Sequence, residues 1–206
     1  MNPRHHPSPD ILAAYAAGTL APGFGLVVGA HVETCAACRK QVASYEAASG
    51  AALQVLPVEP VGGDAFTQVM SRIAAAPAAE PIKVDARPLL ERLPLKPRRW
   101  VAPGVWVAAV DTPHAEEDRV YLLSVAPGMP TARHEHSGAE FCTVLQGAFR
   151  DEVGVFRAGD FAAAENDLDH QPVVVGHEPC VCLFATEGRL KPKGVIGKLA
   201  FAFADV

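Results

Sequence analysis

The chain has 206 residues, half of them hydrophobic, which is enough for one or two domains with substantial cores. Its formal net charge of −5 argues against nucleic acid as the main partner. Residues 1–10 contain prolines and histidines where a signal peptide would need an apolar run, so we expect a cytoplasmic protein with reduced thiols. The five cysteines are then metal ligands, redox groups or buried apolar residues, and not a disulfide framework.

The N-terminal part of the sequence is typical of short helices. Stretches rich in alanine with leucine or valine predict helices over residues 9–17, 22–34 and 36–52. Residues 11–30 carry no charge and are long enough to cross a membrane, but glycines and a proline interrupt them. Two short helices therefore fit this segment better than a membrane span.

A histidine precedes a Cys-x-x-Cys pair at the boundary between the second and third predicted helices. Residues four apart share one face of a helix, so His31 and Cys35 can reach one small ion, and Cys38 follows one turn later. Imidazole and thiolate ligands favour tetrahedral Zn²⁺, whereas a redox dithiol is the alternative for the cysteine pair. A fourth ligand can come from His5 or His6, which lie just before the first predicted helix.

A fourth helix is expected over residues 64–76. Its apolar residues recur at helical spacing and form a narrow stripe: Phe66, Val69, Met70 and Ile73. The stripe must dock either on the first three helices or on another protein. Residues 77–97 contain five prolines and predict an extended linker.

The sequence changes to strands after the linker. Short segments rich in β-branched and aromatic residues predict an antiparallel barrel or sandwich. The expected strands are residues 100–110, 119–125, 141–145, 161–164, 173–175 and 180–185. The predicted fold class is α + β in two domains, with a small zinc-stapled helical bundle over 1–76, the linker over 77–97 and the β-domain over 98–206.

Residues 128–147 match the first cupin motif, Gly-x5-His-x-His-x3-Glu-x6-Gly, at every fixed position. Alternate residues of a strand share a face, so His134 and His136 can both point into a barrel, and Glu140 can face the same ion. His170 stands at the ligand position of the second cupin motif, whose usual Pro-x-Gly turn is replaced by Glu-Asn-Asp. Three histidines and a glutamate can hold Zn²⁺ or another divalent metal.

The remaining cysteines lie on predicted strands. Cys180 and Cys182 share one strand face, where they are either redox-active thiols or buried core residues. Cys142, on an apolar strand, is expected in the core. We expect His114 and His177 in loops, beside a proline and a glycine.

An N-terminal histidine with His-x3-Cys-x2-Cys on short helices, joined to a cupin, resembles the ChrR family of zinc anti-sigma factors. The resemblance covers about residues 4–76 and 100–187. It implies two sets of metal ligands: His6, His31, Cys35 and Cys38 for zinc in the helical domain, and His134, His136, Glu140 and His170 in the cupin. It also implies that the helical domain binds an extracytoplasmic-function sigma factor and blocks its access to RNA polymerase. The cupin would release the sigma factor under oxidative signals such as singlet oxygen or organic hydroperoxides.

In this interpretation the zinc is structural, the signal is read at the cupin, and the linker passes the change on. The negative charge suits a partner with a basic surface. The main alternative is a metal-dependent cupin dioxygenase or isomerase with an accessory zinc module. Two further alternatives are a membrane-tethered regulator and a zinc-finger DNA binder, although few lysines and arginines surround the zinc motif.

Overall fold

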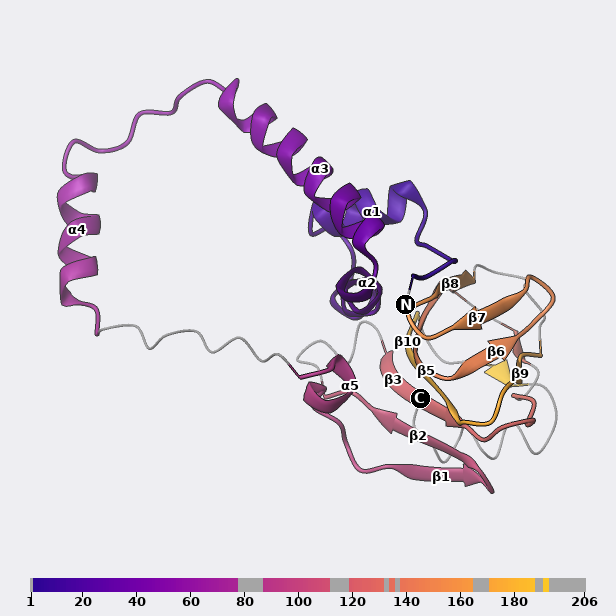
Figure 1. Cartoon of the computed structure of the whole chain (residues 1–206). Coiled ribbons are helices and arrows are strands. Elements are labelled where there is room, and N and C mark those ends of the chain that lie inside the picture. The colour runs from indigo at the N-terminus through magenta and orange to yellow at the C-terminus, as the bar shows by residue number, and fades with distance from the viewer. Residues whose placement is uncertain are drawn as a thin grey trace.

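The computed structural model describes residues 2–77, 87–111, 119–131, 134–135, 138–164, 171–187 and 191–192, with the backbone alone at 134–135 and 191–192. Three helices lie beside a layered β-domain, and a fourth helix stands apart from both (Figure 1). The predicted α + β class, a helical bundle followed by an antiparallel β-domain, is confirmed. Among the described helices, none is both long and apolar enough to span a membrane.

The expected helices form within two residues of their predicted ends. They are α1 Pro9–Ala16, α2 Pro22–Thr34, α3 Ala36–Gln54 and α4 Ala65–Ala75. α1 and α2 begin at prolines, whose missing N–H is not needed in a first turn. Between α2 and α3, Cys35 adopts an extended conformation and its sulfur accepts the N–H of Cys38. The break between the two helices thus lies inside the metal motif.

The expectation of an extended linker is wrong in its second half. One helical turn, α5 Leu89–Arg92, forms directly after Pro88, because a proline is tolerated at a helix start. Three leucines of this segment pack against the core: Leu89, Leu90 and Leu93. Arg92 also forms an ion pair with Glu33 of α2. Residues 78–86 of the expected linker lie outside the described residues.

The β-domain is built from antiparallel strands. The main sheet has six strands in the order β1-β2-β3-β10-β5-β8, a second sheet has the order β7-β6-β9, and β4 pairs with β11. The strands are β1 Arg99–Ala102, β2 Val105–Ala109, β3 Arg119–Val125, β4 His134–Glu135, β5 Glu140–Gln146, β6 Ala148–Arg150, β7 Val155–Arg157, β8 Phe161–Ala164, β9 Val173–Val174, β10 Cys180–Thr186 and β11 Lys191–Pro192.

The predicted single strand over residues 100–110 is instead a hairpin. β1 and β2 pair with each other across a turn at Gly104, whose φ of 75° lies in the left-handed region. A side chain at this position would also place its Cβ 2.8 Å from the Cβ of Ala126. The sequence expectation missed the turn because apolar residues continue on both sides of it.

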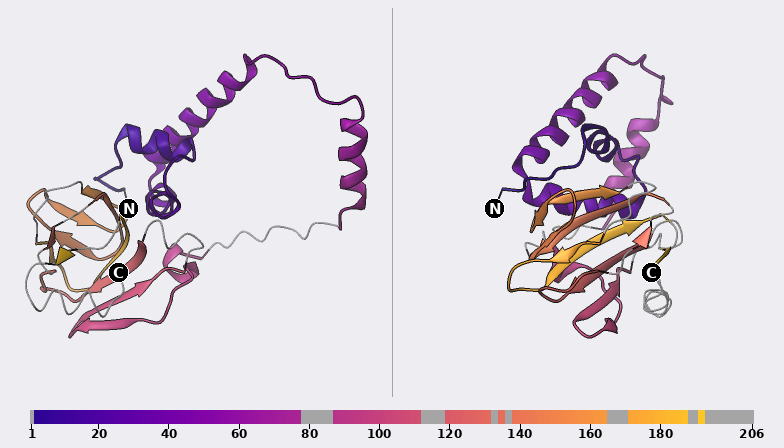
Figure 2. Two further views of the ribbon diagram at one scale, coloured as in Figure 1. Left: turned by 180° about the vertical axis from the view of Figure 1, so that it is seen from behind. Right: turned by 90° about the vertical axis from the view of Figure 1, so that its right-hand side faces the viewer.

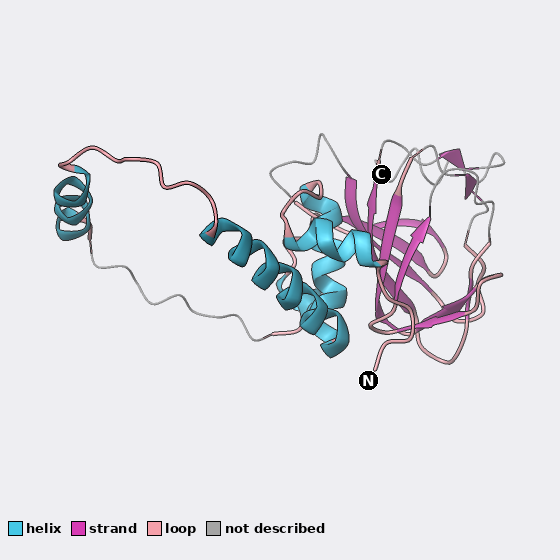
Figure 3. Ribbon diagram, turned by 90° about the horizontal axis from the view of Figure 1, so that it is seen from above, coloured by secondary structure: helices cyan, strands magenta, loops and turns pink. Residues whose placement is uncertain are grey.

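Both faces of the main sheet are covered by hydrophobic packing. On β5, Cys142 and Val144 pack toward the second sheet, in a cluster that includes Phe149 and Phe156. The residues that alternate with them, beginning with Phe141, face the helices. Figure 3 shows helices beside this face of the sheet, with α4 well apart from them, and α2 is the helix that packs on β5 and β10.

The helices and the main sheet share one hydrophobic core. The ring of Phe24 in α2 meets the ring of Phe141 edge-on, with centroids 4.7 Å apart. Nearby, the Thr143 hydroxyl donates a hydrogen bond of 2.8 Å to the Val27 carbonyl. Figure 2 shows from two sides how closely the helices approach the sheet. The two predicted domains are therefore joined by packing as well as by the chain between them.

Replacing Phe24 by alanine should lower the free energy of unfolding by about 3 kcal/mol, because the ring is buried between helix and sheet. Since both tryptophans, Trp100 and Trp106, lie in the β-domain, the helical circular dichroism and the tryptophan fluorescence should shift together in urea. Phe66→Ala is the matched control: Phe66 is 77% exposed, so its loss should change stability by less than about 0.5 kcal/mol. A shift confined to the circular dichroism would contradict the shared core.

Candidate metal centre

Four side chains from four places in the chain meet beside the β-domain. His31 comes from the last turn of α2, Cys35 from the break after it, and Cys38 from the first turn of α3. His6 comes from the N-terminal segment that precedes α1. Their ligand atoms all lie within 4.8 Å of one another. The structure thus brings together the residues that the resemblance implied, and places His6, not His5, in the cluster.

The spacing of the donor atoms suits a tetrahedral ion. His6 Nδ1 lies 3.4 Å from His31 Nε2, and His31 Nε2 lies 3.3 Å from Cys38 Sγ. His6 Nδ1 is 3.4 Å from Cys35 Sγ and 3.5 Å from Cys38 Sγ. A tetrahedral zinc ion with ordinary bond lengths has donor–donor distances of about 3.3 to 3.8 Å. These four of the six donor–donor distances therefore match those around such an ion, and all six are within 4.8 Å.

Three of the four side chains in the cluster are buried and one is exposed. His31, Cys35 and Cys38 are buried, whereas His6 is exposed. Burial, with a smaller contribution from Cys35, raises the pKa of Cys38 to about 12. Burial likewise lowers the pKa of His31. Both shifts disfavour charge in the metal-free site, and a bound cation would reverse this preference for the thiols because it stabilises thiolate.

The β-domain supplies the second layer of contacts around this cluster. His31 Nδ1 lies 2.7 Å from the Gly159 carbonyl oxygen, so it donates to that oxygen and leaves Nε2 for a metal. Asp160 Oδ1 accepts the N–H groups of Arg4 at 2.6 Å and His5 at 3.1 Å. His5 Nδ1 lies 3.2 Å from Asp160 Oδ2. His5, the other candidate ligand in the sequence, is thus held by Asp160.

Asp160 is a buried carboxylate directly before β8. Its burial acts to raise its pKa, but the N–H groups of Arg157, Arg4 and His5 outweigh this effect and lower the pKa of Asp160 below its usual value. Sequence reasoning did not find this residue. Asp160 lies 154 positions from His6, and no local pattern links it to the metal motif.

The proposed cupin ligands are described only in part. Glu140 lies at the start of β5, on the same side as Cys142, and is buried. Burial raises the pKa of Glu140 to about 8, which favours the neutral acid in the absence of a cation. His134 lies in β4, where only the backbone is described. His136 and His170 lie outside the described residues.

Three thiols gather inside the β-domain. Cys180 Sγ and Cys182 Sγ are 3.6 Å apart, and Cys142 also hydrogen-bonds to Cys182. The hydrogen bond to Cys182, followed by burial, raises the pKa of Cys180. The hydrogen bond with Cys142 is the main cause that raises the pKa of Cys182. Burial is the main cause that raises the pKa of Cys142. All three are therefore thiols and not thiolates in this state. His177 is exposed in a loop, as expected, and His114 lies outside the described residues.

Known proteins share this combination of modules. Residues 95–190 match the family model of the ChrR cupin-like domain. One chain in the crystal structure of Rhodobacter sphaeroides SigE in complex with the anti-sigma ChrR is 35% identical, over 89% of this chain and 99% of that chain, with a TM-score of 0.76. These matches define a protein with an N-terminal helical module and a ChrR-type cupin.

A curated relative matches the chain from end to end. The anti-sigma-E factor ChrR of Cereibacter sphaeroides is 34% identical over 210 residues, which cover 98% of this chain and 99% of the relative. The chain belongs to the ChrR family of anti-sigma factors.

Proposed function

We propose that this chain is an anti-sigma factor whose helical module binds an extracytoplasmic-function sigma factor and keeps it from RNA polymerase. The observation that carries the proposal is the apolar stripe of α4, which no part of the described chain buries. A relative that is 35% identical has been crystallised in complex with SigE. Family membership also favours this regulatory role over the metal-dependent cupin enzyme.

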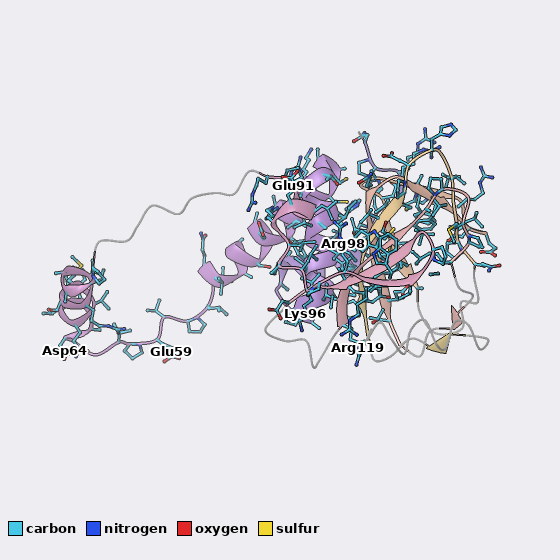
Figure 4. The ribbon with its side chains drawn as sticks, turned by 90° about the horizontal axis from the view of Figure 1, so that it is seen from below. Glu59, Asp64, Glu91, Lys96, Arg98 and Arg119 are labelled. Carbon is cyan, nitrogen blue, oxygen red and sulfur yellow. The ribbon has the colours of Figure 1, made fainter. Side chains whose placement is uncertain are left out.

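The stripe of α4 is exposed along its whole length. Its four side chains have exposed fractions of 47% to 77%: Phe66, Val69, Met70 and Ile73. Figure 4 shows α4 away from the body of the molecule, with Asp64 near its start and Glu59 on the segment before it. An isolated helix of 11 residues is marginal in water, so this one needs a surface to pack on. Sequence reasoning left two docking surfaces open, and we infer that the sigma factor provides the surface.

The segment that precedes α4 also exposes apolar side chains. The end of α3 and the loop after it expose five large hydrophobic residues: Leu53, Val55, Leu56, Val58 and Val61. Exposed apolar residues this dense along one segment are typical of a protein–protein interaction site. We therefore extend the proposed sigma-binding surface from the end of α3 to α4.

We propose zinc as the ion held by His6, His31, Cys35 and Cys38. Two imidazoles and two thiols whose donor atoms lie within 4.8 Å of one another form a closed donor set, which is characteristic of structural zinc. The four residues join the N-terminal segment to α2 and α3. The ion would keep these helices in the arrangement from which the sigma-binding surface extends.

We propose that the cupin reads the oxidative signal, with His134, His136, Glu140 and His170 as ligands of zinc or another divalent metal. The buried Glu140 carboxyl supports a cation there, because its ionised form is otherwise disfavoured. Singlet oxygen or organic hydroperoxides are the proposed signals. Cys180 and Cys182 are further candidates for oxidation, although their raised pKa values require the β-domain to open before they react as thiolates.

The cytoplasm is the proposed location of this chain. A protein that competes with RNA polymerase for a sigma factor must occupy the same compartment. Reduced thiols there are consistent with the five free or metal-binding cysteines that we propose.

The substitution Ile73→Asp should weaken binding of the cognate sigma factor by about 30-fold, corresponding to about 2 kcal/mol for a residue buried at an interface. Ser71→Asp is the matched control, because it places the same charge near the same helix end on the polar face. Binding is measured by isothermal titration calorimetry with the extracytoplasmic-function sigma factor encoded nearest to this chain. Equal affinities for the two variants would overturn the assignment of α4 to the interface.

The double substitution His134→Ala with Glu140→Ala should leave sigma binding intact and abolish release by an organic hydroperoxide. The control pair His177→Ala with Glu178→Ala changes the same residue types at exposed positions and should release normally. Retained sigma binding shows that the variant is folded. Release is measured as loss of the complex in size-exclusion chromatography. Normal release by the first pair would contradict the sensing role of the cupin.

A further inference from the structure

The exposed zinc ligand, His6, lies on a segment whose position depends on the cupin. The backbone on its N-terminal side is fixed by Asp160, which accepts the N–H groups of Arg4 and His5. The Phe161 N–H donates in turn to the His5 carbonyl oxygen at 3.1 Å. The residue immediately before His6 is thus hydrogen-bonded through both its N–H and its C=O to adjacent residues of the β-domain.

A second zinc ligand depends on the same turn of the β-domain. The Gly159 carbonyl accepts the Nδ1–H of the fully buried His31. Such a contact selects the tautomer that presents Nε2 to the ion and fixes the orientation of the ring. Two of the four zinc ligands are therefore oriented by neighbouring residues, Gly159 and Asp160.

The fit of this turn is close. Gly159 has a φ of 92°, and a Cβ built on it would lie 3.1 Å from Pro3 Cγ and 3.3 Å from Thr34 Oγ1. Asp160 Oδ2 also accepts the Arg157 N–H at 2.8 Å, which holds its carboxylate within the turn. On the other side, the His5 ring stacks on Phe156 with centroids 4.1 Å apart. The contact between the N-terminal segment and this turn therefore combines close packing with several hydrogen bonds.

We propose that the β7–β8 turn, residues 157–161, is the outer part of the zinc site, with Asp160 as the positioning residue for His6 and Gly159 as that for His31. The inference rests on the proposed binding of zinc by this cluster. The sequence analysis expected the linker to pass a change in the cupin to the helical module. In this proposal, the direct contact between the turn and the N-terminal segment passes it instead. A change in the cupin that moves the turn loosens His6 and weakens zinc binding. By linkage, zinc binding stabilises the turn to the same extent.

The test is zinc affinity of the full chain, measured by competition with a chromogenic chelator. Asp160→Ala should weaken binding at the helical site by about 10- to 100-fold, the range found for residues that orient metal ligands. Asp160→Asn, which keeps one acceptor oxygen, should lie between Asp160→Ala and the wild type. Asp111→Ala removes an exposed carboxylate of the same domain and should bind zinc like the wild type.

A second readout separates positioning from a general loss of stability. Loaded with Co²⁺, the wild type should show the visible d–d bands of a tetrahedral site, and Asp160→Ala should shift them toward the spectrum of His6→Ala. An Asp160→Ala variant that is less stable but has wild-type zinc affinity and an unchanged Co²⁺ spectrum would overturn the inference.

Failure of the zinc proposal itself gives a different result. If the cluster does not hold the ion, His6→Ala and Cys35→Ser will bind as much zinc as the wild type. If the cluster holds the ion but the turn does not position it, these two variants will lose zinc and Asp160→Ala will not.

Discussion

The N-terminal segment of this protein is held by a buried carboxylate, Asp160, which accepts backbone N–H groups of that segment 155 and 156 residues away in the chain. Asp160 is 2% exposed, and an ionised carboxylate at such a depth is stable only when donors surround it. Arg4, His5 and Arg157 supply those donors. Because His6 follows directly, satisfying this one buried charge also places the fourth member of the candidate metal cluster.

The same surface gives the helical module its stability. A module of three short helices buries little on its own, and here α2 packs its apolar face on the main sheet through Phe24, Val27 and their neighbours. α4 is the opposite case, with its large apolar side chains in water. The chain thus combines a helical part that is fixed on the cupin with one whose apolar side chains are available to a partner, as the proposed sigma binding requires.

Local chemistry made much of this structure predictable. Helix boundaries followed from prolines and alanine-rich stretches, and the cluster of His31, Cys35 and Cys38 from spacing along the chain. The choice of His6 over His5 came from the family resemblance and not from local chemistry, because it depends on Asp160, which is distant in sequence. The short helix α5 was not predicted, because the prolines around it favoured an extended segment and its three leucines are explained only by tertiary packing. The hairpin at Gly104 was not predicted, because a single glycine is a weak turn signal among apolar residues.

We infer that the His/Cys cluster and the cupin form one coupled unit through the β7–β8 turn. Amide hydrogen exchange of the full chain, with zinc bound and after its removal by a chelator, tests this most directly. Removal of the zinc should accelerate exchange at His5 and Phe161, whose N–H groups donate across the contact, while Leu183, deep in the main sheet, keeps its protection. Unchanged protection at His5 and Phe161 after the zinc has left His31, Cys35 and Cys38 would contradict it.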